Sequence, residues 1–134
     1  DMFFLKNNFF VYEDIAICGT RGWLCPNDTK FDESDKKIYE RECIRLKLSL
    51  NAAVNGGYEK NMIVMLHYPP MNDKHEESGF TDIIKEYNGV NTVIYGHLHG
   101  RESIDGRFEG MLNGAEYRLV SADYLNFTPV KITE

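Results

Sequence analysis

The sequence predicts an α/β fold in which helices flank a mixed β-sheet. The 134 residues are 43% hydrophobic, a composition that supports one folded domain spanning residues 1–134. Short runs of β-branched and aromatic residues alternate with segments of helical periodicity along the chain. Between residues 61 and 95 a strand, a helix and a strand follow one another, an order that favours a parallel βαβ unit.

Two short strands and one long helix are expected in the first half of the chain. Apolar and aromatic residues at 8–12 and 14–18 predict the strands, and a loop rich in Gly, Asp and Asn follows over 19–34. The helix is predicted for 36–54, with Ser34 or Asp35 as its N-cap and the glycines that follow Asn55 as its end. The apolar residues of this helix share one face: Tyr39, Cys43, Leu46, Leu50 and Ala53, with Ile38 and Leu48 beside them.

The second half of the chain is expected to contain more strands than helices. A buried strand at 61–66 leads into a charged loop at 71–79, a short helix at 81–87 and a strand at 91–95. Pro69 and Pro70 stop the first of these strands, because proline cannot donate to a ladder. Further strands are predicted at 116–121 and 130–133, as antiparallel edge strands.

Charge and cysteine content exclude several classes of protein. The net charge is −6 and no block rich in Lys and Arg interrupts it, so we expect no nucleic-acid-binding face. No apolar segment reaches the ~20 residues that a membrane-spanning helix needs. Cys18, Cys25 and Cys43 form an odd set without zinc-ribbon spacing, which indicates free thiols and a cytoplasmic location. Asp1 ahead of Met2 indicates a fragment of a longer chain.

Three of the four histidines follow predicted strands. His67 comes directly after the apolar run at 62–66, and His97 and His99 follow the run at 91–95. Imidazole is a common ligand of zinc and similar ions, and such sites are often built at strand ends. If residues 97–99 are extended, both rings point the same way, and Gly96 and Gly100 let the backbone turn on either side. The pattern predicts a metal site.

Simpler interpretations apply to the other candidate residues. A single histidine at a strand end is often only a polar terminus, and we favour that interpretation for His75, which lies in the charged loop. A two-metal centre needs a bridging carboxylate, and no acidic residue has a suggestive position. Asp73, Asp82 and Asp105 are expected to be solvated. The local sequence supports a metal site without completing it.

The strand-end motifs resemble those of a known family. An apolar strand followed by His67-Tyr68-Pro69-Pro70, and a second followed by Gly96-His97-Leu98-His99, are similar to the last two metal motifs of the calcineurin-like metallophosphoesterases. The segments 17–23, 41–46 and 117–121 look like those of a bacterial branch of predicted phosphohydrolases. The resemblance covers nearly the whole chain but only the C-terminal half of the family's domain, so we expect a partial metallophosphoesterase β-sandwich with its N-terminal half missing.

The resemblance implies a function. It assigns His67 and His97 to one metal ion and His99 to a second, with two divalent ions of Mn, Fe or Zn in the intact enzyme. The implied reaction is hydrolysis of a phosphate ester by metal-activated water. Nucleotides, phosphoproteins and small esters all remain open as substrates.

The family's earlier motifs are Asp-x-His, Gly-Asp-x-x-Asp and Gly-Asn-His-Asp/Glu, and our interpretation is that this chain carries none of them. They supply the bridging aspartate and the remaining ligands, so this chain holds no catalytic residue of its own, and we expect it to be nearly inactive alone. A non-catalytic module that binds metal or phosphate is one alternative, and a plain α/β structural domain is another. Exposed sheet edges, left open by a missing half, would favour a homo-oligomer.

Arg21 is a candidate for binding the substrate phosphate. It lies in Gly19-Thr20-Arg21-Gly22-Trp23, on a flexible turn after a strand, where a guanidinium can grip phosphate in a bidentate way. The alternative is a surface arginine beside a tryptophan that fills the core.

Overall fold

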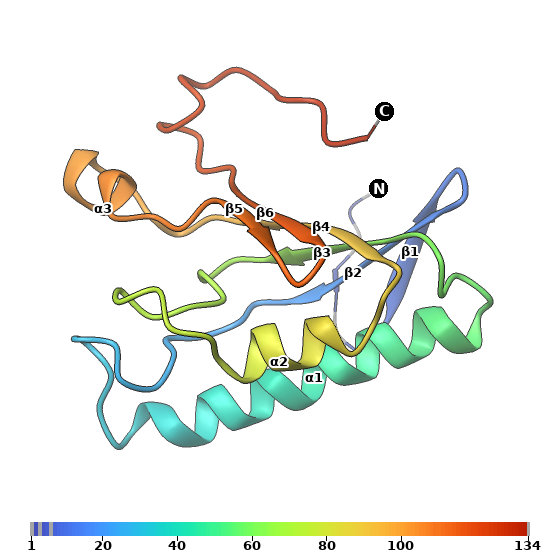
Figure 1. Cartoon of the computed structure of the whole chain (residues 1–134), viewed down its shortest axis with the longest axis horizontal. Helices are drawn as coiled ribbons and strands as arrows, with labels where there is room; N and C mark the ends of the chain where they lie inside the picture. The colour runs from blue at the N-terminus through green and yellow to red at the C-terminus, as the bar shows by residue number, and fades with distance from the viewer. Residues whose placement is uncertain (1, 3, 6, 134) are drawn as a thin grey trace.

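The computed structural model describes residues 2, 4, 5 and 7–133, and these form a mixed six-stranded sheet with helices (Figure 1). The α/β prediction is therefore confirmed. The two stacked sheets of a complete sandwich are not seen, because every strand among the described residues joins the same sheet. In chain order the elements are β1 (Phe9–Tyr12), β2 (Ile15–Thr20), α1 (Asp35–Asn55), β3 (Met62–Leu66), α2 (Gly79–Lys85), β4 (Val90–Tyr95), α3 (Arg101–Asp105), β5 (Gly110–Leu112) and β6 (Ala115–Leu119).

The sheet has the strand order β1-β2-β3-β4-β6-β5. Its four inner strands, β2, β3, β4 and β6, run parallel, while β1 and β5 pair antiparallel at the two edges. The predicted parallel βαβ unit is confirmed as β3-α2-β4. Four carboxyl ends of parallel strands therefore meet at one edge of the sheet, which is the edge that carries the predicted histidines.

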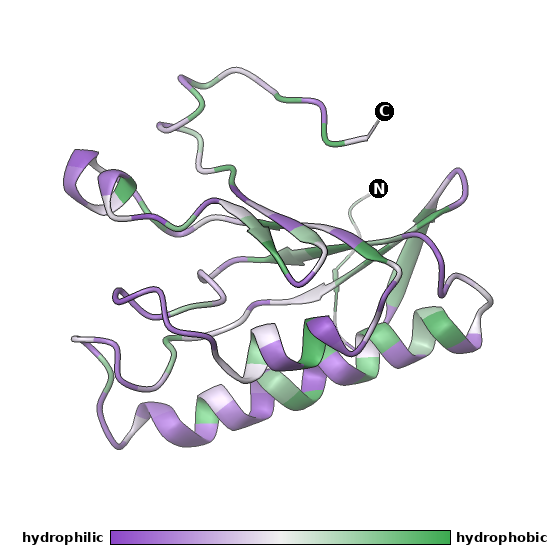
Figure 2. Ribbon diagram, in the orientation of Figure 1, coloured by the Kyte–Doolittle hydropathy of each residue, from purple (hydrophilic) through white to green (hydrophobic). Residues whose placement is uncertain are grey.

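The main core lies between the sheet and α1 with α2, which cover one face of the sheet in Figure 1. Met62 and Val64 of β3 point into this layer and are fully buried, whereas Met65 on the other face is 41% exposed. Figure 2 shows β3 as largely hydrophobic and the loop that leads into α2 as largely hydrophilic. Side chains alternate between the two faces of a strand. One face of β3 therefore contributes to the core, and the other face is more exposed to solvent.

The helix α1 begins and ends within a residue of its predicted bounds. Its predicted apolar face is mostly right, since Leu46 and Leu50 are fully buried, but Leu48 is 45% exposed and Cys43 is only partly buried. Glu42 and Ser49 are polar yet completely buried on this face. At the C-terminal end Gly57, with φ of +92°, takes the left-handed conformation that closes the helix.

The last third of the chain departs most from the predicted elements. The strand expected at 116–121 is β6, but it lies inside the sheet and pairs parallel with β4 rather than forming an antiparallel edge. The antiparallel edge is β5, which was not predicted, and neither was α3. No strand forms at 130–133, because turns after Ser121 carry this segment off the sheet edge and across its face (Figure 1).

Candidate functional site

Backbone hydrogen bonds continue the sheet past the carboxyl ends of its parallel strands. The carbonyl of Arg21, after β2, accepts hydrogen bonds from the N–H groups of His67 (3.0 Å) and Tyr68 (2.9 Å), after β3. The N–H of Gly96, after β4, donates to the carbonyl of His67 at 3.1 Å. Arg21, His67 and Gly96 therefore lie side by side at what we call the strand-end edge. Parallel α/β sheets commonly bind ligands at this position.

His67 and His97 face each other across the strand-end edge. Nδ1 of His97 lies 3.2 Å from Nε2 of His67, and the ring planes meet at 76°. Such a contact joins an N–H donor on one ring to a lone pair on the other, so the accepting ring is neutral. The structure therefore brings together two of the three predicted metal ligands, and we call them the histidine pair.

A strained turn aims His97 at His67. The N–H of Leu98 donates to the carbonyl of Gly96 at 2.8 Å, and His97 between them has φ of +71°. A three-residue turn with positive φ is rare and strained. The expected extended conformation of 97–99 is wrong, and it is His97 itself, rather than Gly96, that takes the left-handed conformation. Gly100, with φ of +82°, does use the freedom of glycine as expected.

His99 is paired with Asp123. Its Nδ1 lies 3.0 Å from Oδ1 of Asp123, and the other oxygen of this carboxylate accepts the N–H of Gly100 at 2.9 Å. The Gly100 N–H and then His99 lower the pKa of Asp123. A carboxylate that accepts a hydrogen bond from Nδ1–H fixes the tautomer whose Nε2 lone pair is free for a metal. Asp123 was not anticipated, because it is a single acidic residue in an irregular segment 24 positions after His99.

The pKa of His97 is lowered below its usual value. Burial of the ring is the main cause, followed by the charges of His67, His99 and Lys30. A lowered pKa keeps the imidazole neutral near pH 7, the form that offers a lone pair.

Aromatic packing supports the histidine pair. The ring of Tyr68 lies over His97 with centroids 4.1 Å apart and meets His67 edge-on at 5.2 Å. Trp23 packs on Tyr68 at 4.9 Å, and its indole N–H donates to Asp35 of α1 at 2.9 Å. These contacts tie the orientation of the imidazoles to the body of the fold.

Arg21 reaches the buried carboxylate of Glu42 on α1. Its guanidinium donates to Oε1 of Glu42 at 3.3 Å, lies 4.7 Å from the Trp23 ring centroid and remains 47% exposed. Arg45 donates to the same oxygen at 3.0 Å, and the Thr20 hydroxyl donates to the other. Arg21 is thus positioned by Glu42 and still open to solvent. Glu42 was missed because a charged residue on an apolar helix face is normally read as exposed.

The spacing of the histidine pair matches two ligand positions on one ion, provided that the donating ring moves its proton to its other nitrogen. Two nitrogens bound to a tetrahedral zinc at 2.0–2.1 Å are about 3.3–3.4 Å apart, close to the observed spacing. Among residues 2, 4, 5 and 7–133, however, no group of three or more His, Cys, Asp or Glu side chains could hold a metal. The buried hydroxyl of Ser121, in the irregular segment that follows β6, has no hydrogen-bond partner within the described part of the chain. A Cβ on Gly96 would lie 3.9 Å from it, so an unused polar group adjoins the strand-end edge.

The remaining candidates have other roles. Nε2 of His75 lies 2.7 Å from the carbonyl of Gly106, away from the pair. Asp73 and His75 are two positions apart and match the Asp-x-His pattern, contrary to the expectation that this chain lacks the motif. The carboxylate of Asp73, however, accepts the N–H of Thr29 at 3.2 Å and holds a loop. Asp82 and Asp105 are exposed, as expected.

Within the described residues, no helix is both long and apolar enough to cross a bilayer. No protein-family model, curated protein or solved structure matches the chain.

Proposed function

We propose that this chain carries part of a dinuclear, metal-dependent phosphohydrolase site of the calcineurin-like metallophosphoesterase kind. The supporting observation is the 3.2 Å approach of His67 and His97 at the carboxyl ends of parallel strands. The mixed sheet and flanking helices of the chain are compatible with the C-terminal portion of such a domain. The substrate is a phosphate ester.

Each histidine has a distinct role in this proposal. His67 offers Nε2 and His97 offers Nδ1 to one divalent ion of Mn, Fe or Zn. His99, with Asp123 on its Nδ1, offers Nε2 to a second ion. Bound ions of this kind supply a Lewis acid and an activated water. The other ligands come from outside the described residues, so the isolated chain has little or no turnover.

Arg21 is proposed to hold a phosphate oxygen. One nitrogen of its guanidinium is directed at Glu42, and the group retains further N–H donors. A charge-assisted hydrogen bond to phosphate would use these donors. In the intact enzyme, replacing Arg21 with Ala should raise KM or lower kcat.

A non-catalytic module that binds metal or phosphate is the second candidate. It is favoured by the absence, among the described residues, of any carboxylate grouped with the histidine pair. Reading the coding DNA upstream of residue 1 separates the two candidates, because only the enzyme requires the aspartate motifs there. We further propose a cytoplasmic protein, on the basis of three free cysteines, and self-association through the β1 and β5 edges.

The test is zinc-dependent binding of methylphosphonate, a small mimic of a phosphate ester, followed by ³¹P NMR line broadening. We expect broadening only when zinc is present. The substitutions His67→Ala and His97→Ala should each abolish it, whereas His75→Ala should leave it unchanged as a matched histidine control. Broadening that is absent with zinc, or that survives the His67→Ala/His97→Ala double substitution, would exclude the proposed site.

A further inference from the structure

We propose that the pocket beside the histidine pair binds the organic group of the phosphate ester and that this group carries a flat ring, as in a nucleotide. The inference rests on the proposed function and names its substrate class. The pocket has a volume of about 450 Å³, and His97 and Tyr68 belong to its lining. That volume lies within the ~300–1,000 Å³ typical of small-molecule sites. The pocket therefore borders the proposed phosphate position at His97.

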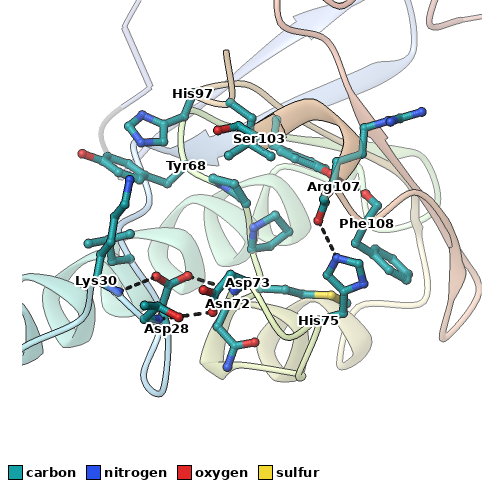
Figure 3. A pocket seen from close by; sticks show the side chains of 18 of the residues that line it. Asp28, Lys30, Tyr68, Asn72, Asp73, His75, His97, Ser103, Arg107 and Phe108 are labelled. Carbon is teal, nitrogen blue, oxygen red and sulfur yellow. Dashed lines mark hydrogen bonds between the residues drawn. The ribbon is translucent and has the colours of Figure 1, made fainter. Parts of the chain in front are cut away.

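Aromatic side chains line two sides of this pocket. Figure 3 shows Tyr68 and His97 on one side, and His75 and Phe108 on the other. The rings of His75 and Phe108 pack at 5.8 Å with an interplanar angle of 68°. Rings and flat bases stack or pack edge-on with such groups. A flat ring thus gains contacts here that a sugar or an aliphatic group does not.

Two loops that form the pocket floor are tied together before any ligand arrives. The carboxylate of Asp28 accepts the N–H of Asp73 at 2.9 Å, and that of Asp73 accepts the N–H of Thr29 at 3.2 Å. The side-chain amide of Asn72 donates to the carbonyl of Pro26 at 3.1 Å. These acidic groups are thereby engaged with backbone donors. A pocket floor that is already fixed in this way loses little conformational entropy when a ligand binds.

The far wall is fastened to the same floor. His75 in the floor loop contacts the carbonyl of Gly106, just after α3. The hydroxyl of Tyr95 donates to the carbonyl of Phe108. Phe108 also packs on Tyr117 of β6 at 6.0 Å. The pocket is therefore bounded on both sides by anchored rings.

Lys30 is placed to recognise the charge of the phosphate. It lines the pocket, and Figure 3 shows its side chain extending toward Tyr68. Within the described part of the chain, no carboxylate forms an ion pair with its ammonium group. Lys30 and His97 both belong to the lining of this pocket. An unpaired cation at the junction of pocket and histidine pair suits an anion whose organic part enters the pocket.

The experiment uses Trp23, which lines the pocket and is the one tryptophan of the sequence. With zinc present, Trp23 fluorescence is titrated with AMP, with ribose 5-phosphate and with adenosine. We expect AMP to bind about fivefold or more tightly than ribose 5-phosphate, since one stacked base supplies at least that factor.

Two pairs of variants locate the binding. Ser103→Phe fills the pocket from an exposed position and should reduce AMP binding to the level of ribose 5-phosphate, whereas Ser103→Ala should not. Lys30→Ala should weaken AMP and ribose 5-phosphate alike and leave adenosine unchanged. Lys60→Ala, at the opposite end of β3, is the matched control for charge.

The outcomes separate the two proposals. Equal affinity for AMP and ribose 5-phosphate, no response to any of the three ligands, or an AMP preference that survives Ser103→Phe would each overturn the pocket assignment. None of these results bears on zinc-dependent methylphosphonate binding, which is a separate measurement and tests the phosphohydrolase proposal. Adenosine bound in the pocket without any zinc-dependent methylphosphonate binding would reject that proposal alone.

Discussion

Among single residues, Glu42 links helix α1 to the strand-end edge through its contact with Arg21. Its side chain is completely buried and receives hydrogen bonds from Thr20, Arg21 and Arg45. A buried carboxylate is tolerated only when its oxygens are satisfied in this way. Both arginines are partly exposed, so solvent screens part of the attraction.

Replacing Glu42 with Ala should lower the free energy of unfolding by about 2 kcal/mol, because a cavity forms and the Thr20 hydroxyl loses its acceptor. Urea unfolding followed by circular dichroism measures this change. Glu40→Ala, on the exposed side of the same helix, should shift the free energy by less than about 0.5 kcal/mol. Equal effects of the two substitutions would show that the buried network contributes nothing.

The conformation of His97 is a second residue-scale property. Its φ of +71° is unfavourable for any side chain with a Cβ and costs roughly 1–2 kcal/mol. We predict that His97→Gly is more stable to urea than His97→Ala by about 1 kcal/mol, since only Gly relieves the strain. At His99 the same two substitutions should rank in the opposite order, because His99 lacks a positive φ. A His97→Ala protein as stable as His97→Gly would rule out strain at this turn.

Residue patterns predicted part of the site. His67 and His97 could be placed because each follows a short apolar strand, and parallel strand ends converge. Asp123 and Glu42 could not, since their partners His99 and Arg21 lie far away in sequence and only the fold brings them together. The strained turn at His97 also left no sequence signal beyond the neighbouring glycines.

At the scale of elements, prediction worked where periodicity was strong. The long helix and the inner strands before residue 96 were placed correctly, because apolar spacing reports burial directly. The hairpin β5–β6 was missed although Asn113-Gly114, both with positive φ, joins its strands. That pair is a strong hairpin signal, but β5 has only three residues, which is too short to show an alternating apolar pattern. The prediction of a strand at 130–133 was wrong, because local composition does not reveal whether a sheet edge is available for pairing.

The close approach of β2 and β3 depends on Gly19. A Cβ at this position would lie 1.9 Å from the carbonyl oxygen of Met65. We predict that Gly19→Ala lowers the free energy of unfolding by about 2–3 kcal/mol, because the two strands must separate. Gly106→Ala, whose Cβ would meet its nearest neighbour at 3.6 Å, is the control and should be tolerated. Thermal unfolding measures both, and an unchanged Gly19→Ala would mean that the strands are not so closely packed.

For the whole molecule, the buried thiols predict how stability changes with pH. Burial raises the pKa of Cys18 to about 11, of Cys43 to about 11 and of Cys25 to about 12, from a usual value of 9.0. Below pH 9 both states keep these protons, so the stability is fully present. Above pH 9 the unfolded chain releases protons that the folded chain retains, so stability falls as pH rises toward 11 and 12. Melting temperatures measured from pH 8 to pH 11 should fall, and a constant value would contradict this burial.

The most direct test of the histidine pair is a zinc titration of the whole chain, followed by NMR of the four histidine side chains. The account predicts that the ring signals of His67 and His97 shift together, at the same zinc concentration, while those of His75 do not move. His67→Ala should then remove the shift of His97, since one imidazole alone binds zinc weakly. Independent shifts of His67 and His97, or a response of His75 as large as theirs, would contradict a shared metal site.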